Sequence, residues 1–135
     1  MSAYATRPEA ARSVYVAVAL GGAAGGYLRV ALSLLPGTGS AASWPWITFA
    51  VNVAGTFVLA LALSLLRVRR CSESLWRPLV GTGFCGALTT FSTLQLEVFR
   101  MLRADRPGLA FGYLAASVLA GVAAVLAGIA LARWA

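Results

Sequence analysis

Four long apolar runs decide what this chain can fold into. They cover residues 14–35, 46–66, 79–102 and 109–131. An α-helix rises about 1.5 Å per residue, so each run is long enough to cross the hydrocarbon core of a bilayer. Only 11% of the residues are charged, against about 25% in soluble domains. We therefore predict an all-α protein, a four-helix transmembrane bundle over residues 14–135 that follows an N-terminal tail over residues 1–13.

The charged residues are few, and most of them flank the apolar runs. All eleven cations are Arg, and four acids leave a net charge of +7. In a soluble protein this charge would favour nucleic acid, but beside membrane spans it faces lipid headgroups and orients the helices. The chain has no His, and its Asp and Glu residues form no pair or metal motif. We predict neither enzyme activity nor nucleic-acid binding, and two free thiols, Cys71 and Cys85.

The Arg residues also bear on topology, because an even number of spans places both termini on one side. Seven Arg would lie on that side and four on the other. The seven are Arg7, Arg12, Arg67, Arg69, Arg70, Arg77 and Arg133, and the four are Arg29, Arg100, Arg103 and Arg106. The positive-inside rule favours cytoplasmic termini, but a bias this modest permits insertion in both orientations.

Polar side chains recur four residues apart in three of the runs. The sets are Thr48, Asn52 and Thr56, then Thr89, Thr93 and Glu97, then Tyr113, Ser117 and Gly121. Taken alone, each set is explained by hydrogen bonding and close packing between helices. Together, they form a track of mostly uncharged donors, which suits a small anion, whereas a cation path would show rings of acids or aimed carbonyls. Four helices cannot enclose such a path alone, so a pore would need a second copy.

The third run is the least compatible with lipid. It contains Gly, Thr, Ser, Gln and Glu within membrane reach. A helix that faces lipid would not carry these residues, so this run should face protein or water, and we expect its helix to be broken.

Three segments of these runs resemble the CrcB (Fluc) family of fluoride channels. They are GGAAGGYLR in the first run, FAVNVAGTF in the second and GTGFCGALTTFSTLQLE in the third, and Tyr113-x₃-Ser117-x₃-Gly121 extends the match into the fourth. The resemblance covers roughly residues 14–131. It implies an antiparallel, dual-topology dimer with two pores, which lets fluoride leave the cytoplasm passively across the bacterial inner membrane.

The resemblance also implies roles for particular residues. Backbone carbonyls of Gly86 and Thr89 would hold a structural sodium ion at the dimer centre, where the third helix is broken. Phe91 would turn its ring edge, which carries partial positive charge, toward fluoride. The remaining members of the predicted fluoride pore are Thr48, Asn52, Ser92, Thr93, Tyr113, Ser117, Arg29 near the mouth and Glu97 at the end of the third-helix motif.

The sequence departs from the family pattern at two positions. The family often has a second Phe where this chain has Leu94, and its GGLTT motif has Ala87 as the second residue here. We expect a homodimer, but a paralogous partner that supplies the missing ring is the alternative.

Two other functions stay open. A proton-coupled exchanger of the small multidrug type has similar size, but it needs a buried acid in the first helix, and residues 14–35 contain none. Only Glu97 could serve in its place. A non-transporting membrane scaffold would explain the glycines of the first run but not the track of donors.

Overall fold

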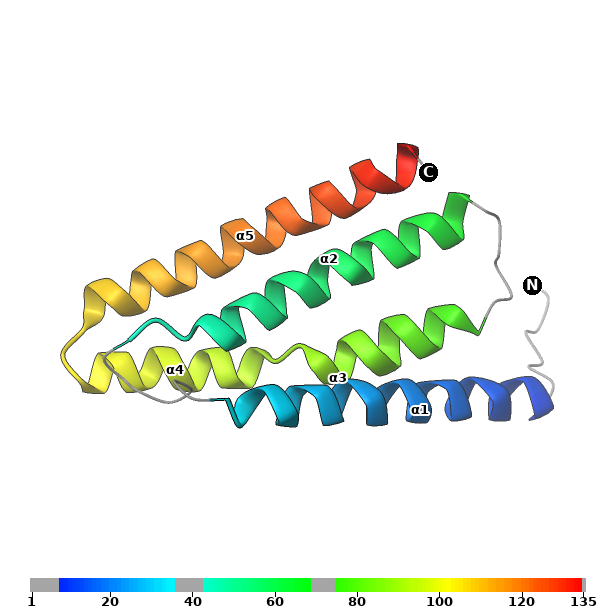
Figure 1. Cartoon of the computed structure of the whole chain (residues 1–135), viewed down its shortest axis with the longest axis horizontal. Helices are drawn as coiled ribbons and strands as arrows, with labels where there is room; N and C mark the ends of the chain where they lie inside the picture. The colour runs from blue at the N-terminus through cyan, green and yellow to red at the C-terminus, as the bar shows by residue number, and fades with distance from the viewer. Residues whose placement is uncertain (1–7, 36–42, 69–74, 135) are drawn as a thin grey trace, which may run out of the picture.

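The chain is helical in the part that the computed structural model describes, residues 8–35, 43–68 and 75–134. Three helices are long and apolar enough to cross a membrane: α1 (Pro8–Ser33), α2 (Trp46–Val68) and α5 (Pro107–Trp134). Between α2 and α5 the chain forms η1 (Arg77–Cys85), α3 (Gly86–Leu88) and α4 (Phe91–Arg103). These three elements run end to end beside their neighbours and make up the predicted third span (Figure 1). The predicted all-α class is confirmed.

The first helix begins within the predicted N-terminal tail. Helix α1 begins at Pro8, so residues 8–13 of the predicted tail are helical. Proline is favoured in the first turn of a helix because its fixed φ matches helical geometry and its missing N–H would have no partner there. The apolarity of the first run therefore marks the membrane span but not the start of the helix. Residues 1–7 lie outside the described part.

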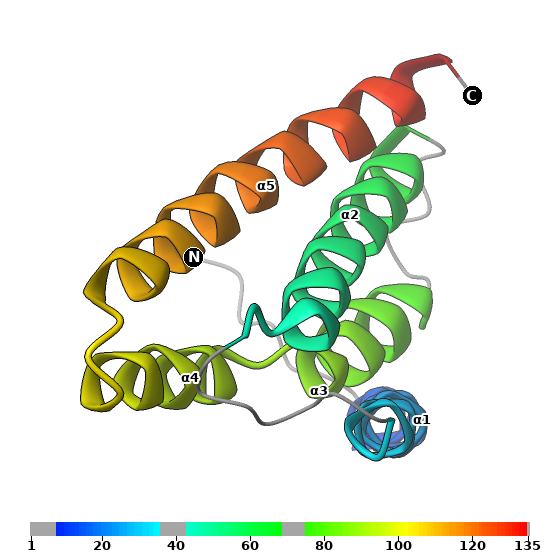
Figure 2. The ribbon, with the colours of Figure 1, turned by 60° about the vertical axis from the view of Figure 1, so that its left-hand side comes forward.

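The third span changes neighbours halfway along its length. Its first half, η1 and α3, packs against α1, whereas α4 packs against α5. Helix α2 lies between these two halves of the molecule and packs against both η1 and α5 (Figure 2). The spans thus form an open arrangement in which α1 and α5 lie on opposite flanks.

Close helix contacts depend on glycine. A Cβ added to Gly83 would lie 2.7 Å from the Val18 carbonyl oxygen, and one on Gly21 or Gly25 would overlap the backbone of η1. On α5, a Cβ on Gly128 would lie 2.9 Å from the Leu61 nitrogen of α2. These contacts are the small-residue packing that holds helices together in lipid.

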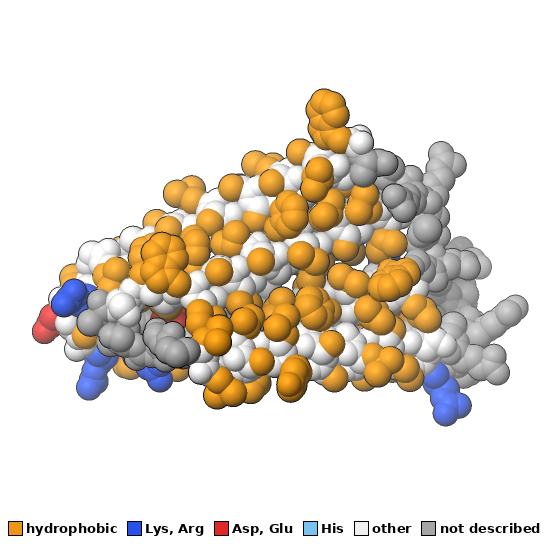
Figure 3. Space-filling view, viewed as in Figure 1, with side chains coloured by type: hydrophobic (Ala, Val, Ile, Leu, Met, Phe, Trp, Pro, Cys, Tyr) orange, Lys and Arg blue, Asp and Glu red, His pale blue; other side chains and the backbone are white. Residues whose placement is uncertain are grey.

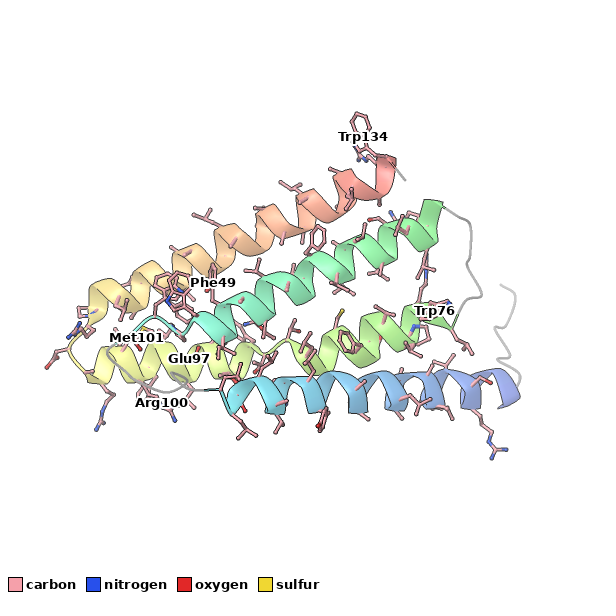
Figure 4. All side chains as sticks on the ribbon, viewed as in Figure 1. Phe49, Trp76, Glu97, Arg100, Met101 and Trp134 are labelled. Carbon is pink, nitrogen blue, oxygen red and sulfur yellow. The ribbon has the colours of Figure 1, made fainter. Side chains whose placement is uncertain are left out.

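The face of the chain in Figure 3 is largely apolar, and the Arg side chains visible on it lie toward its two ends. Large side chains along the helices stay exposed, for example Tyr27 at 79% and Leu119 at 70%. Trp76 and Trp134 lie at one end of the bundle, and Glu97 and Arg100 lie toward the other (Figure 4). An apolar band between polar ends is the surface expected of a protein that spans a bilayer.

Among the described residues, each end of the bundle carries four Arg. Arg12, Arg67, Arg77 and Arg133 belong to the end where α1 starts, and Arg29, Arg100, Arg103 and Arg106 to the other. The other three Arg of the predicted bias, Arg7, Arg69 and Arg70, lie outside the described residues, as does Cys71.

Candidate functional site

The chain leaves helical geometry at two consecutive threonines in the middle of the third span. Thr89 has φ −77° and ψ 149°, and Thr90 has φ −147° and ψ 115°, both extended. Thr90 then caps α4, because its hydroxyl accepts a hydrogen bond from the Thr93 N–H at 3.2 Å. β-Branched residues favour extended backbone, and Thr is a good N-cap residue, so the pair suits both tasks.

Asn52 of α2 holds this extended segment in place. Its Nδ2 donates to the Thr90 carbonyl at 3.1 Å, and its Oδ1 accepts from the Thr90 N–H at 2.8 Å. The side-chain amide therefore satisfies both polar groups of one residue, as a neighbouring β-strand would. One N–H of the Asn52 amide is used in this way, and a second remains.

Because of these hydrogen bonds, the N–H groups of Thr90 and Thr93 do not donate to the carbonyls that they would reach in an α-helix. In a continuous α-helix the Thr90 N–H would donate to the Gly86 carbonyl, and the Thr93 N–H to the Thr89 carbonyl. Here the first donates to the Asn52 side chain and the second to the Thr90 hydroxyl. A carbonyl oxygen that accepts no helical hydrogen bond is a suitable ligand for a hard cation. The donor set at Gly86 and Thr89 thus fits the predicted sodium site.

Glu97 of α4 links two other helices. The Thr48 hydroxyl of α2 donates to Glu97 Oε1 at 2.6 Å, and the Tyr113 hydroxyl of α5 donates to Oε2 at 2.8 Å. Tyr113 is fully buried and packs edge-on against Trp44, with ring centroids 5.3 Å apart. Three residues of the predicted pore set therefore form one hydrogen-bonded group.

A cavity of about 450 Å³ opens beside this group, toward the end of the bundle where α1 ends and α2 begins. Its polar lining comes from the end of α1, the start of α2 and α4. The lining includes Arg29, Ser33, Thr48, Thr90, Thr93, Glu97 and Arg100. Two guanidinium groups and several hydroxyls around one carboxylate make this cavity suited to small anions. It brings together four of the predicted pore residues: Arg29, Thr48, Thr93 and Glu97.

The other predicted pore residues lie outside this cavity lining. Phe91 is 70% exposed on the surface of the single chain, and Ser92 is exposed beside it. Ser117 Oγ is buried beside the Tyr113 hydroxyl and makes no other hydrogen bond within the described residues.

Leu94 occupies a different position from that of Phe91. It is 7% exposed and packs inside the subunit with Met101, Ala110 and Tyr113. Its side chain therefore fills the interior between α4 and α5.

Two further residues, Thr90 and Arg100, belong to the site although they were not among the predicted pore residues. Thr90 meets Asn52, Ser92 and Thr93, with its hydroxyl 3.2 Å from Ser92 Oγ and 3.0 Å from Thr93 Oγ1. Its position before an amphipathic segment was an available N-cap signal. Arg100 lies three residues after Glu97, on the cavity side of α4, and helical spacing from Glu97 would have placed it there.

The fold and site together define a class, a multi-pass α-helical membrane protein with an open cavity lined by both polar and apolar side chains. Residues 16–129 match the family described as CrcB-like protein, Camphor Resistance (CrcB), and the chain belongs to this family. A protein of Mycolicibacterium paratuberculosis named fluoride-specific ion channel FluC 1 is 50% identical over 109 residues, which cover 81% of this chain and 82% of that protein. FluC 2 of Nocardia farcinica is 39% identical over 135 residues, covering 100% of this chain and 96% of that protein. FluC of Caulobacter vibrioides is 40% identical over 117 residues, covering 86% and 92%.

Proposed function

We propose that this chain forms a fluoride-specific channel through which fluoride leaves the cytoplasm passively, in the inner membrane of a bacterium. The observation that carries the proposal is the cavity of Arg29, Thr48, Thr93 and Glu97 in a chain whose relatives are named fluoride-specific ion channels. Fluoride is small and strongly hydrated, so close donors must replace its water. The hydroxyls of the cavity and the second Asn52 N–H are such donors.

The channel is proposed to work as a dimer of antiparallel subunits. Helix α4 presents Phe91, Ser92 and Gln95 on an exposed face. Gln95 lies five residues from the break, about 7 Å along the helix axis and thus within the hydrocarbon core. An amide exposed to lipid at that depth is unfavourable, so a second copy and the pore between the copies would cover it. The bias of seven Arg to four between the two sides is modest, which permits insertion in both orientations.

A homodimer suffices in this proposal. The ring that is missing at position 94 leaves no gap that a paralogous partner must fill, because Leu94 packs against Tyr113 within its own subunit. The Phe91 rings of two identical subunits would supply the aromatic edges of the pores.

A structural sodium ion is proposed at the dimer centre, held by the carbonyls of Gly86 and Thr89. When bound, it would offset the repulsion between these carbonyls and draw the two breaks together. The chain's own contribution is the Asn52–Thr90 pairing, which keeps the segment extended and the carbonyls without helical donors.

The test is fluoride efflux from liposomes that contain only this protein. We expect efflux driven by the fluoride gradient, strong exclusion of chloride and no requirement for a proton gradient. Chloride flux at the fluoride rate would contradict the selectivity. Flux that needs a proton gradient and is lost in Glu97→Gln would instead support the exchanger. Flux that appears only after a second subunit is added would replace the homodimer with a heterodimer.

A further inference from the structure

A second cavity lies at the opposite end of the bundle from the first. It has a volume of about 310 Å³ and lies between the C-terminal halves of α2 and α5. Its polar residues, Thr56, Ser64 and Arg67, all come from α2, and apolar side chains such as Leu63 and Ile129 complete the lining. None of these polar residues belongs to the site described above.

The hydroxyls of Thr56 and Ser64 in this cavity are available to hydrogen-bond a ligand. Ser and Thr in a helix commonly bond back to the carbonyl one turn earlier. In the described part of the chain, however, neither Thr56 nor Ser64 makes a hydrogen bond. Free hydroxyls inside an apolar lining favour a ligand that accepts hydrogen bonds, and the Arg67 guanidinium at the edge of the membrane favours a negative one.

The cavity is bounded by a tight helix contact. A Cβ on Gly128 of α5 would lie 2.9 Å from the Phe57 carbonyl and 2.9 Å from the Leu61 nitrogen. Backbones this close cannot approach further, so the spacing of α2 and α5 is fixed at the cavity. The hydroxyls therefore stand in a defined position.

Helix α2 connects the two cavities. Positions four apart along it carry Thr48 in the first cavity, then Asn52 at the break, then Thr56 in the second cavity. Residues four apart lie on nearly the same face of a helix, so these three side chains follow one another along α2. Gly55, next to Thr56, lies against the Thr89 side chain. The second cavity therefore starts beside the break at mid-membrane and ends with Arg67 at the membrane edge.

We propose that this second cavity binds a small inorganic anion and forms the opposite mouth of the permeation path. The inference rests on the proposed channel function and extends it to residues on the far side of the break. The Arg67 guanidinium would attract the anion, and the Thr56 and Ser64 hydroxyls would replace part of its water. The same chemistry could instead serve the phosphate of an anionic lipid, so the experiment separates the two sources.

The test compares Arg67→Gln with Arg133→Gln, a matched control. Arg133 is exposed at the same end of the bundle but does not line the cavity. Fluoride efflux is measured in vesicles of neutral phosphatidylcholine and in vesicles with anionic phosphatidylglycerol, for variants that elute as the wild type does. In both lipids we expect Arg67→Gln to slow efflux about two- to five-fold at low salt, and less at high salt, because the guanidinium acts by long-range attraction. Arg133→Gln should leave the rate unchanged.

Thr56→Val supplies an independent arm, because it removes one hydroxyl at constant shape. We expect efflux to fall about five-fold, the effect of one hydrogen bond of ordinary strength. If the wild type conducts fluoride and neither Arg67→Gln nor Thr56→Val changes the rate, the second mouth is refuted while the channel stands. If Arg67→Gln lowers thermal stability only in anionic vesicles and leaves flux intact, the site binds lipid. A wild type without fluoride flux overturns the channel and this inference together.

Discussion

Replacing Asn52 should lower the free energy of unfolding more than replacing any other polar residue of α2. Asn52→Leu removes both hydrogen bonds to Thr90, which measure 3.1 and 2.8 Å. It leaves the Thr90 N–H and C=O without partners beside an apolar side chain. The extended segment then loses the contact that holds it against α2.

The cost follows from the number of groups left unsatisfied. Each fully buried donor or acceptor without a partner costs about 1–3 kcal/mol. The two Thr90 groups are only partly buried, so about 2–6 kcal/mol is the upper range of the cost if the segment keeps its conformation. Asn52→Asp is the informative second change, because a carboxylate still accepts from the Thr90 N–H but sets an oxygen against the Thr90 carbonyl. We expect Asn52→Asp to be destabilised and to lose fluoride flux, since it removes every donor at this position.

Unfolding in mixed micelles, followed by tryptophan fluorescence, gives the stability, and liposome efflux gives the activity. Thr56→Val is the control for stability, because it removes a polar group from the next turn of α2 that makes no hydrogen bond within the described chain. Its free energy of unfolding should stay within about 0.5 kcal/mol of the wild type. If Asn52→Leu is destabilised by no more than Thr56→Val, the pairing with Thr90 does not hold the break in place.

Four further outcomes are expected. Gly83→Ala should lower the melting temperature strongly, because its Cβ would lie 2.7 Å from the Val18 carbonyl oxygen, whereas Gly22→Ala, with open space around it, should be neutral or slightly stabilising. Tyr113→Phe should cost about 1.5–3 kcal/mol of unfolding free energy, since one Glu97 oxygen loses its hydroxyl donor; an unchanged melting curve would contradict this. Phe91→Ala should leave the folding of the subunit intact because the ring is 70% exposed, yet slow fluoride efflux about five-fold or more. Replacing sodium with a large organic cation should lower the melting temperature of the dimer, and identical curves in both salts would argue against the sodium site.

The membrane-spanning fold could be predicted from the sequence because lipid imposes a simple length rule. Three apolar runs appear as three long helices, and the polar third run could be singled out because its Gly, Thr and Glu residues cannot face lipid. Boundaries were harder to place. Hydropathy marks where the membrane begins, whereas the start of α1 at Pro8 depends on local backbone preference in polar surroundings.

The composition of the site could be predicted only in part. Spacing of four residues placed Thr93 and Glu97 on one face of α4, and both line the cavity. The spacing of residues along one helix does not reveal which residues of other helices they contact. The pairing of Asn52 with the Thr90 backbone, the two hydroxyls that meet Glu97, and the burial of Leu94 beside Tyr113 therefore had to come from the structure.

The break in the third span connects these observations, because it serves packing and chemistry at once. The third span changes partners at the extended Thr89–Thr90 segment, with η1 on α1 before it and α4 on α5 after it. Beyond this segment, Glu97 accepts hydrogen bonds from Thr48 and Tyr113. At the segment itself, the N–H groups of Thr90 and Thr93 donate to side chains and not to the carbonyls of Gly86 and Thr89. A substitution that restores helical backbone at Thr90 would therefore disturb the cavity and the carbonyls together, although it touches neither Glu97 nor Gly86.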